Sequence, residues 1–125
     1  MKNNFFAIFF AGLWIVVSEF VRNEFLLKSF WVQHYSRLNL EFITLPVNGI
    51  LWTVWSFVFA WIIYKLLSKF TFGEVFCIAW TAGFVLMWFT LYNLQVLPLA
   101  LLIYAIPLSL LEVWLAQIII LKLKA

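Results

Sequence analysis

Residues 18–31, SEFVRNEFLLKSFW, separate the first apolar segment of the chain from a long connection. About a dozen almost continuously apolar residues precede this stretch. Polar and charged side chains then appear in quick succession: Ser18, Glu19, Arg22, Asn23, Glu24 and Lys28. Such a change in composition is expected where a helix leaves a membrane, and equally where a polar site lies inside one.

The composition as a whole favours a protein that lies in lipid. The 125 residues are 67% hydrophobic, 22% aromatic and only 10% charged. A water-soluble domain of this size would expose large apolar patches and would aggregate, whereas a bilayer surrounds apolar side chains with hydrocarbon. We therefore expect an all-α integral membrane protein that forms a single transmembrane domain over residues 1–125.

Four apolar segments are close to the roughly twenty residues with which an α-helix crosses the hydrocarbon core. Helices are expected at about 5–24, 46–67, 72–92 and 97–121. Pro46 suits the first turn of the second helix, and Thr71 with Glu74 has the spacing of a capping box before the third. The sequence predicts an up-down bundle of four transmembrane helices.

The connection between the first two helices, about 25–45, is long and aromatic. Side chains such as Phe30, Trp31 and Tyr35 would not remain in water, and Trp and Tyr rings prefer the membrane interface. We expect an interfacial helical segment here that continues the first helix. Glu24 and Lys28 have the i, i+4 spacing of a helical ion pair.

The distribution of Lys and Arg predicts the orientation of the bundle. With four crossings, the side of the termini carries five of these residues and the opposite side three: Lys2, Lys65, Lys69, Lys122 and Lys124 against Arg22, Lys28 and Arg37. Positively charged loops tend to remain in the cytoplasm. Both termini are therefore expected in the cytoplasm, in a bacterial inner membrane. The first apolar run lacks a small-residue cleavage site, so we expect it to be retained as an anchor.

Glu112, within the segment IPLSLLEVWLAQIII at 106–120, is the most informative ionisable residue. It lies about 13 Å from the end of its expected helix, so its carboxyl group should face protein or a wet cavity and not lipid. Ala105, Ser109 and Ala116 share its helical face. Small residues let helices approach closely, so we predict that this face packs against another helix.

A second row of small residues lies on the expected helix 46–67, at Gly49, Thr53, Ser56 and Ala60. In the simplest structural alternative, Glu112 is a neutral acid that hydrogen-bonds to Thr53 or Ser56. Bulky residues are then expected to face lipid or the outside of the bundle: Phe57, Phe59, Trp61, Phe84, Trp88 and Trp114.

Glu19, Arg22 and Asn23 form a polar group near the end of the first helix. Arg22 and Asn23 follow Glu19 by three and four residues, so each can reach it. Helical rise places Glu19 roughly 21 Å along the hydrocarbon core. We expect Glu19 and Glu112 to line one cavity without sharing a proton directly. A local ion pair that eases the exit of the helix is the structural alternative for Glu19 and Arg22.

Signatures of catalysis and of cofactor binding are scarce. The chain has no Asp, one His and one Cys, so a Ser-His-Asp triad is impossible, and it contains no Gly-rich phosphate loop or His-Glu-x-x-His motif. The net charge of +3 is spread thinly along the chain. We expect no cofactor, no metal site and no nucleic-acid partner, and enzymatic activity is disfavoured without being excluded.

The leading hypothesis is a protein that binds or transports a small hydrophobic or cationic solute through its intramembrane acids. The candidate ligand- or proton-binding residues are Glu112, Glu19, Arg22, Asn23, Thr53, Ser56 and Ser109. In size, helix count and acidic first helix the chain is similar to the small multidrug resistance transporters. This resemblance concerns architecture only, and no residue role is carried over from it.

Two alternatives come from other classes of protein. One is a non-catalytic structural or assembly subunit of a larger membrane complex, or a homodimer. The other is a lipid-modifying membrane enzyme in which Glu19, Arg22, Asn23 and His34 act together at the outer interface. Membrane lipids are expected partners in every case.

Overall fold

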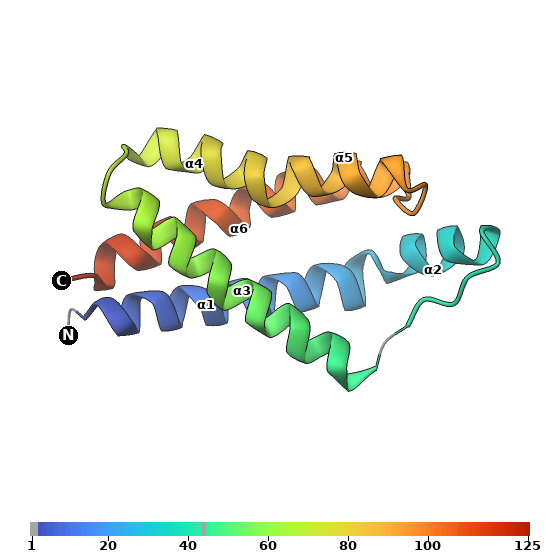
Figure 1. Cartoon of the computed structure of the whole chain (residues 1–125), viewed down its shortest axis with the longest axis horizontal. Helices are drawn as coiled ribbons and strands as arrows, with labels where there is room; N and C mark the ends of the chain where they lie inside the picture. Colours follow the sequence, from blue (N-terminus) through green and yellow to red (C-terminus); the bar gives the residue numbers. More distant parts are fainter. Residues whose placement is uncertain (1–2, 44) are drawn as a thin grey trace.

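The structure, a computed structural model, describes residues 3–43 and 45–125. Within these residues every regular element is helical. Four helical units are long and apolar enough to cross a membrane: Asn4–Leu26, Pro46–Leu67, Phe72–Asn93 and Leu99–Leu123. They run back and forth, so that the two termini lie at one end of the bundle (Figure 1). Lys2, which entered the predicted charge balance, lies outside the described residues.

Three of the four long units contain a change of helix type, and only α3 is a single uninterrupted α-helix. In chain order the elements are α1 (Asn4–Phe20), the π-helix η1 (Val21–Leu26), α2 (Lys28–Arg37), α3 (Pro46–Leu67), α4 (Phe72–Trp80), the π-helix η2 (Thr81–Val85), α5 (Leu86–Asn93), the 3-10 helix η3 (Leu99–Leu101) and α6 (Leu102–Leu123).

Local chemistry explains where the helices begin. Pro46 is the first residue of α3, where its missing N–H would have had no helical partner. The Thr71 hydroxyl accepts from the Glu74 amide at 3.3 Å, and the Glu74 carboxylate accepts from the Thr71 amide at 2.9 Å. The predicted capping box before α4 is therefore confirmed.

The core of the bundle forms where α1 packs against α3 and α6. Its contact surfaces carry small residues with no solvent exposure: Ala7 and Ala11 of α1, Ala60 of α3 and Ala116 of α6. The absence of large side chains at these positions allows the helix backbones to approach closely.

Phe59 and Phe84 are exceptions to the prediction that bulky residues lie on the outside. Both are buried, and their ring centroids are 5.8 Å apart in an edge-to-face arrangement. Phe59 turns inward because Gly83 leaves room for its ring: a Cβ atom at Gly83 would lie only 2.7 Å from it. The prediction was wrong because glycine creates space for an aromatic ring on a neighbouring helix.

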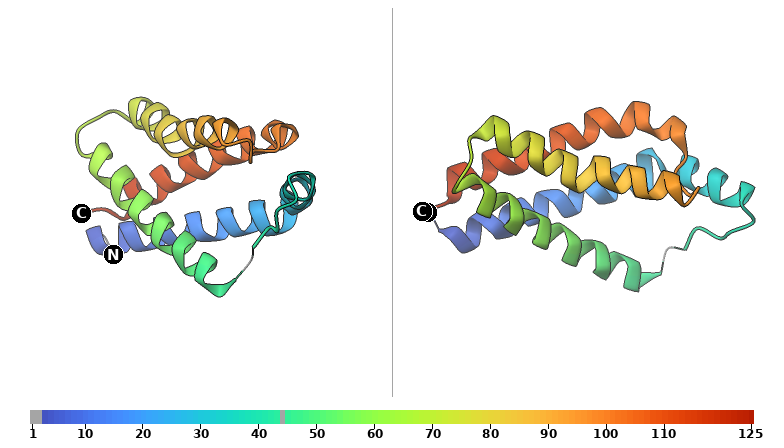
Figure 2. Two further views of the ribbon diagram at one scale, coloured as in Figure 1. Left: turned by 45° about the vertical axis from the view of Figure 1, so that its right-hand side comes forward. Right: turned by 45° about the horizontal axis from the view of Figure 1, so that its top comes forward.

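The N-terminal half of α3 diverges from the other helices, as both views of Figure 2 show. Its residues Gly49 and Thr53 are exposed, whereas Ser56 and Ala60 are buried. The predicted row of small residues therefore packs only in the second half of the helix. Helices that cross at an angle can remain in contact over only part of their length.

Helix α2 lies at the end of the bundle opposite the termini, beside the connection from α5 to η3 (Figure 1). Leu27, just before α2, packs in a small apolar cluster with Leu97, Leu101 and Ala105. Glu24 and Lys28 are paired at 3.6 Å, as their spacing predicted. The long connection thus contains a helix that rests on the bundle.

Candidate functional site

Glu112 faces the interior of the bundle. Its exposed fraction is 0%, and Ala105, Ser109 and Ala116, which share its helical face, are buried with it. The indole Nε1 of Trp14, on α1, donates a hydrogen bond of 2.9 Å to the Glu112 backbone carbonyl. The predicted packing of this face of α6 against another helix is confirmed, and at Glu112 the neighbouring helix is α1.

Arg22 connects Glu112 to Glu19. Its Nη2 atom lies 2.5 Å from Glu19 Oε2, and its Nη1 atom lies 3.3 Å from Glu112 Oε1. Glu19 is 3% exposed and Arg22 5% exposed, so the whole group is removed from solvent. We call Glu19, Arg22 and Glu112 the buried cluster. The pairing of Arg22 with Glu19 follows the sequence prediction, whereas its contact with Glu112 was not anticipated.

Asn23 extends the buried cluster toward α2. Its Nδ2 donates to Glu19 Oε2 at 3.1 Å, and its Oδ1 accepts from Trp31 Nε1 at 3.3 Å. A continuous series of polar contacts therefore leads from Trp31 on α2 to Glu112 on α6. Trp31 was expected only as an interfacial aromatic residue, and its role in this series was missed.

Both π-helical segments contribute to the same contact. Arg22 lies in η1 and Phe84 in η2. The guanidinium carbon of Arg22 is 5.2 Å from the centroid of the Phe84 ring, in cation–π geometry. Single π-helical turns are frequent at functional sites because they displace side chains from the regular helical register. Sequence reasoning missed Phe84 because a π-turn has no clear sequence signature.

The buried cluster contains two carboxylates and one guanidinium. Glu19 Oε1 and Glu112 Oε2 are buried and have no hydrogen-bond partner within residues 3–43 and 45–125. A surplus negative charge in an apolar interior is costly. The arrangement can therefore be neutralised by one proton on either acid or by one bound cation.

The hydroxyl groups proposed as partners of Glu112 lie elsewhere. Thr53 donates to the Gly49 carbonyl and Ser56 to the Trp52 carbonyl, each at 2.8 Å. The expected hydrogen bond from Thr53 or Ser56 to Glu112 is thus not formed, because each hydroxyl bonds to a carbonyl one turn earlier in its own helix.

Ser109 is buried but separate from the ionic contacts. Its Oγ accepts from Trp80 Nε1 and donates to the Ile106 carbonyl, both at 2.9 Å. It connects α6 to α4. Gln117, which the sequence analysis did not single out, makes a similar link: its Nε2 donates to the Phe72 carbonyl at 3.0 Å.

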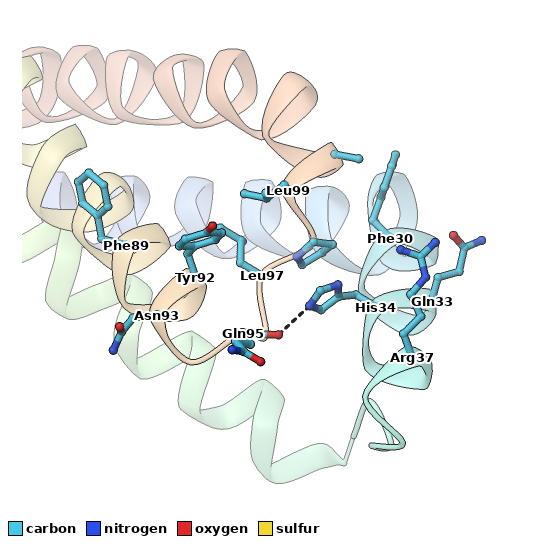
Figure 3. Close-up of a pocket in the computed structure, with 12 residues that line it drawn as sticks. Phe30, Gln33, His34, Arg37, Phe89, Tyr92, Asn93, Gln95, Leu97 and Leu99 are labelled. Carbon is cyan, nitrogen blue, oxygen red and sulfur yellow. Dashed lines mark hydrogen bonds between the residues drawn. The ribbon is translucent and has the colours of Figure 1, made fainter.

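A second polar region, the rim pocket, lies between α2 and the connection from α5 to η3 (Figure 3). Its volume is about 920 Å³. Its polar lining consists of Gln33, His34 and Arg37 of α2, Tyr92 and Asn93 at the end of α5, and Gln95 in the turn that follows. Its apolar lining includes Phe30, Phe89, Leu97 and Leu99. His34 Nε2 lies 2.8 Å from the Gln95 carbonyl oxygen.

Of the four residues in the lipid-modifying hypothesis, only His34 lines the rim pocket. Glu19, Arg22 and Asn23 are not among its lining residues. The structure therefore does not bring the four residues of that hypothesis into one pocket. In the described part of the chain, no three His, Cys, Asp or Glu side chains are grouped so that they could hold a metal ion.

Comparison with known proteins finds no match to a protein-family model, to a curated protein or to a solved structure.

Proposed function

We propose that the chain is a small integral membrane protein that binds a small cationic or hydrophobic solute, in competition with a proton, at the buried cluster. Its four long apolar helices support the membrane location. The end of the bundle with the termini carries Lys65, Lys69, Lys122 and Lys124, and this supports an orientation with both termini in the cytoplasm of a bacterial inner membrane.

The observation that carries the proposal is the surplus carboxylate beside Arg22. With one proton on Glu19 or Glu112, the cluster has no net charge. A cation that enters can take the place of that proton, and the net charge then remains zero. Exchange of one positive charge for another avoids leaving an uncompensated charge in an apolar surrounding.

The two acids lie on different helices, so binding of a solute cation between them would be coupled to a movement of α1 relative to α6. Glu19 belongs to α1 and Glu112 to α6, and Arg22 holds both. A solute cation between the acids would compete with Arg22 for their oxygens and would weaken the link between the two helices. Such a change in helix packing is what a transport cycle requires.

Binding of a lipophilic cation such as tetraphenylphosphonium to the purified chain tests this function. We expect affinity to rise with pH, because the cation displaces a proton, and we expect about one proton to be released for each cation bound. Glu112→Gln should abolish both effects. Glu74→Gln is the matched control, since Glu74 is exposed and glutamine also serves in a capping box. Wild-type binding and pH response in Glu112→Gln would refute the proposal.

A structural role in a larger complex is the second candidate. The divergent N-terminal half of α3 favours it, because Val47, Ile50, Leu51 and Val54 there are exposed and could contact helices of another protein. Mild solubilisation from the native membrane followed by mass analysis would distinguish the two. A defined heteromeric assembly would favour this candidate, and a lone monomer or homodimer would count against it.

A further inference from the structure

The rim pocket carries a positive charge, as a site that binds an anion requires. Arg37 is exposed and makes no ion pair with any described residue. The described residues that line the pocket include no carboxylate. An arginine guanidinium presents paired N–H donors that match the oxygens of a phosphate group. The charge in this pocket is therefore opposite in sign to the surplus charge of the buried cluster.

His34 and the turn after α5 give the pocket a defined wall. A backbone carbonyl can only accept a hydrogen bond, so the Nε2 atom of His34 carries the hydrogen in its contact with Gln95. This bond holds α2 against the turn. Figure 3 shows Gln33 and Arg37 on the α2 side of the pocket, and Tyr92 and Asn93 on the α5 side.

The other walls of the pocket are suited to acyl chains. Phe89, which lines the pocket, is 69% exposed, and Ile103, near the start of α6, is 75% exposed, so both helices that follow one another here present apolar side chains on the outside of the bundle. The Phe30 and Tyr104 rings lie 5.9 Å apart and connect α2 to this surface. A soluble phosphate would leave this apolar lining uncovered.

The pocket also lies at the depth of a lipid head group. Asn93 ends the third long apolar helix and Leu99 begins the fourth, and both line the pocket. Residues at the ends of membrane-crossing helices are level with the phosphates of the bilayer. This step rests on the membrane location in the proposed function, but not on cation binding at the buried cluster.

We propose that the rim pocket binds one anionic phospholipid. Arg37 holds the phosphate, the amide side chain of Gln33 beside it on α2 donates to the polar head group, and the acyl chains lie over Phe89 and α6. A bound lipid of this kind would fasten α2 to the end of α5.

Native mass spectrometry of the full chain tests the site. The chain is purified in mild detergent with equal amounts of phosphatidylglycerol and phosphatidylcholine that carry identical acyl chains. We expect wild type to retain one phosphatidylglycerol with about tenfold preference. Both lipids offer the same phosphate to Arg37, but the quaternary ammonium of phosphatidylcholine is repelled by Arg37 and accepts no hydrogen bond, whereas the glycerol hydroxyls accept one. Arg37→Gln should lose this preference. Lys28→Gln, which removes a positive charge from the same helix outside the pocket, should keep it.

Three results would overturn the proposal. The first is equal retention of both lipids by wild type. The second is an equal loss of preference in Lys28→Gln, which would indicate a general effect of charge. The third is displacement of the lipid by glycerol 3-phosphate at similar concentrations, which would indicate a soluble phosphate ligand. Unchanged lipid retention in Glu112→Gln would separate this site from cation binding at the buried cluster.

Discussion

Arg22 and Arg37 are one short helix apart in the sequence but occupy opposite surroundings. Arg22 is 5% exposed and has two carboxylates and an aromatic ring within reach. Arg37 is exposed, and no described residue pairs with it. The same side chain therefore neutralises internal charge in one region and is free to bind an external anion in the other.

Replacement of Arg22 should lower the stability of the protein most, and far more than the same replacement of Arg37. Arg22→Gln leaves two buried carboxylates facing each other, and we expect the free energy of unfolding in detergent to fall by about 3–5 kcal/mol. Arg37→Gln should change it by no more than about 0.5 kcal/mol. Thermal or denaturant unfolding followed by circular dichroism would measure both.

The loss in Arg22→Gln should be partly reversible. Adding Glu19→Gln and Glu112→Gln removes the unpaired charges and should restore much of the stability. If Arg22→Gln and Arg37→Gln were equally stable, the buried cluster could not be the main ionic contact of the bundle.

Replacement of Phe84 should have the next largest effect. Phe84→Leu retains much of the apolar volume but loses the ring beneath Arg22, and we expect a loss of about 2 kcal/mol in the same unfolding assay. Phe89→Leu makes the same change at an exposed ring of the rim pocket and should leave stability nearly unchanged. A similar loss in both variants would show that the cation–π contact contributes little.

Interruption of the polar series that leads from the buried cluster to Trp31 on α2 should have a smaller effect. Trp31→Phe removes the hydrogen bond to Asn23 and keeps most of the ring, and we expect it to cost about 1 kcal/mol. In the double variant Trp31→Phe with Asn23→Ala, the two losses should be less than additive. Full additivity would mean that the two side chains do not interact.

The smallest expected effect concerns the turn that borders the rim pocket. Gln95 has φ of 63°, in the left-handed region, and ends α5 in a Schellman motif. Gln95→Gly relieves this strain, and we expect a gain of at most about 1 kcal/mol. Asn93→Gly, inside the last turn of α5, should instead destabilise by about 0.5 kcal/mol. Destabilisation by Gln95→Gly would show that the side chain of Gln95 stabilises the turn.

Contacts within one helix were more predictable than contacts between helices. The pairs Glu19–Arg22 and Glu24–Lys28 follow from spacings of three and four residues, which place side chains on one face. The partner of Glu112 did not follow in this way. Thr53 and Ser56 had suitable chemistry, but Thr53 lies in the divergent half of α3, and the hydroxyls of both residues donate to carbonyls of their own helix.

The sequence alone determined the number of long apolar helices, the residues near which they begin and end, and the inward direction of Glu112. These features depend on hydrophobic length, on capping and on the cost of a charge in an apolar surrounding, all of which are local properties. Only the tertiary structure decided that Arg22 joins Glu19 to Glu112 over the ring of Phe84. That contact depends on the relative register of α1, α6 and the two π-helical turns, and register arises from the packing of side chains that are far apart in the chain.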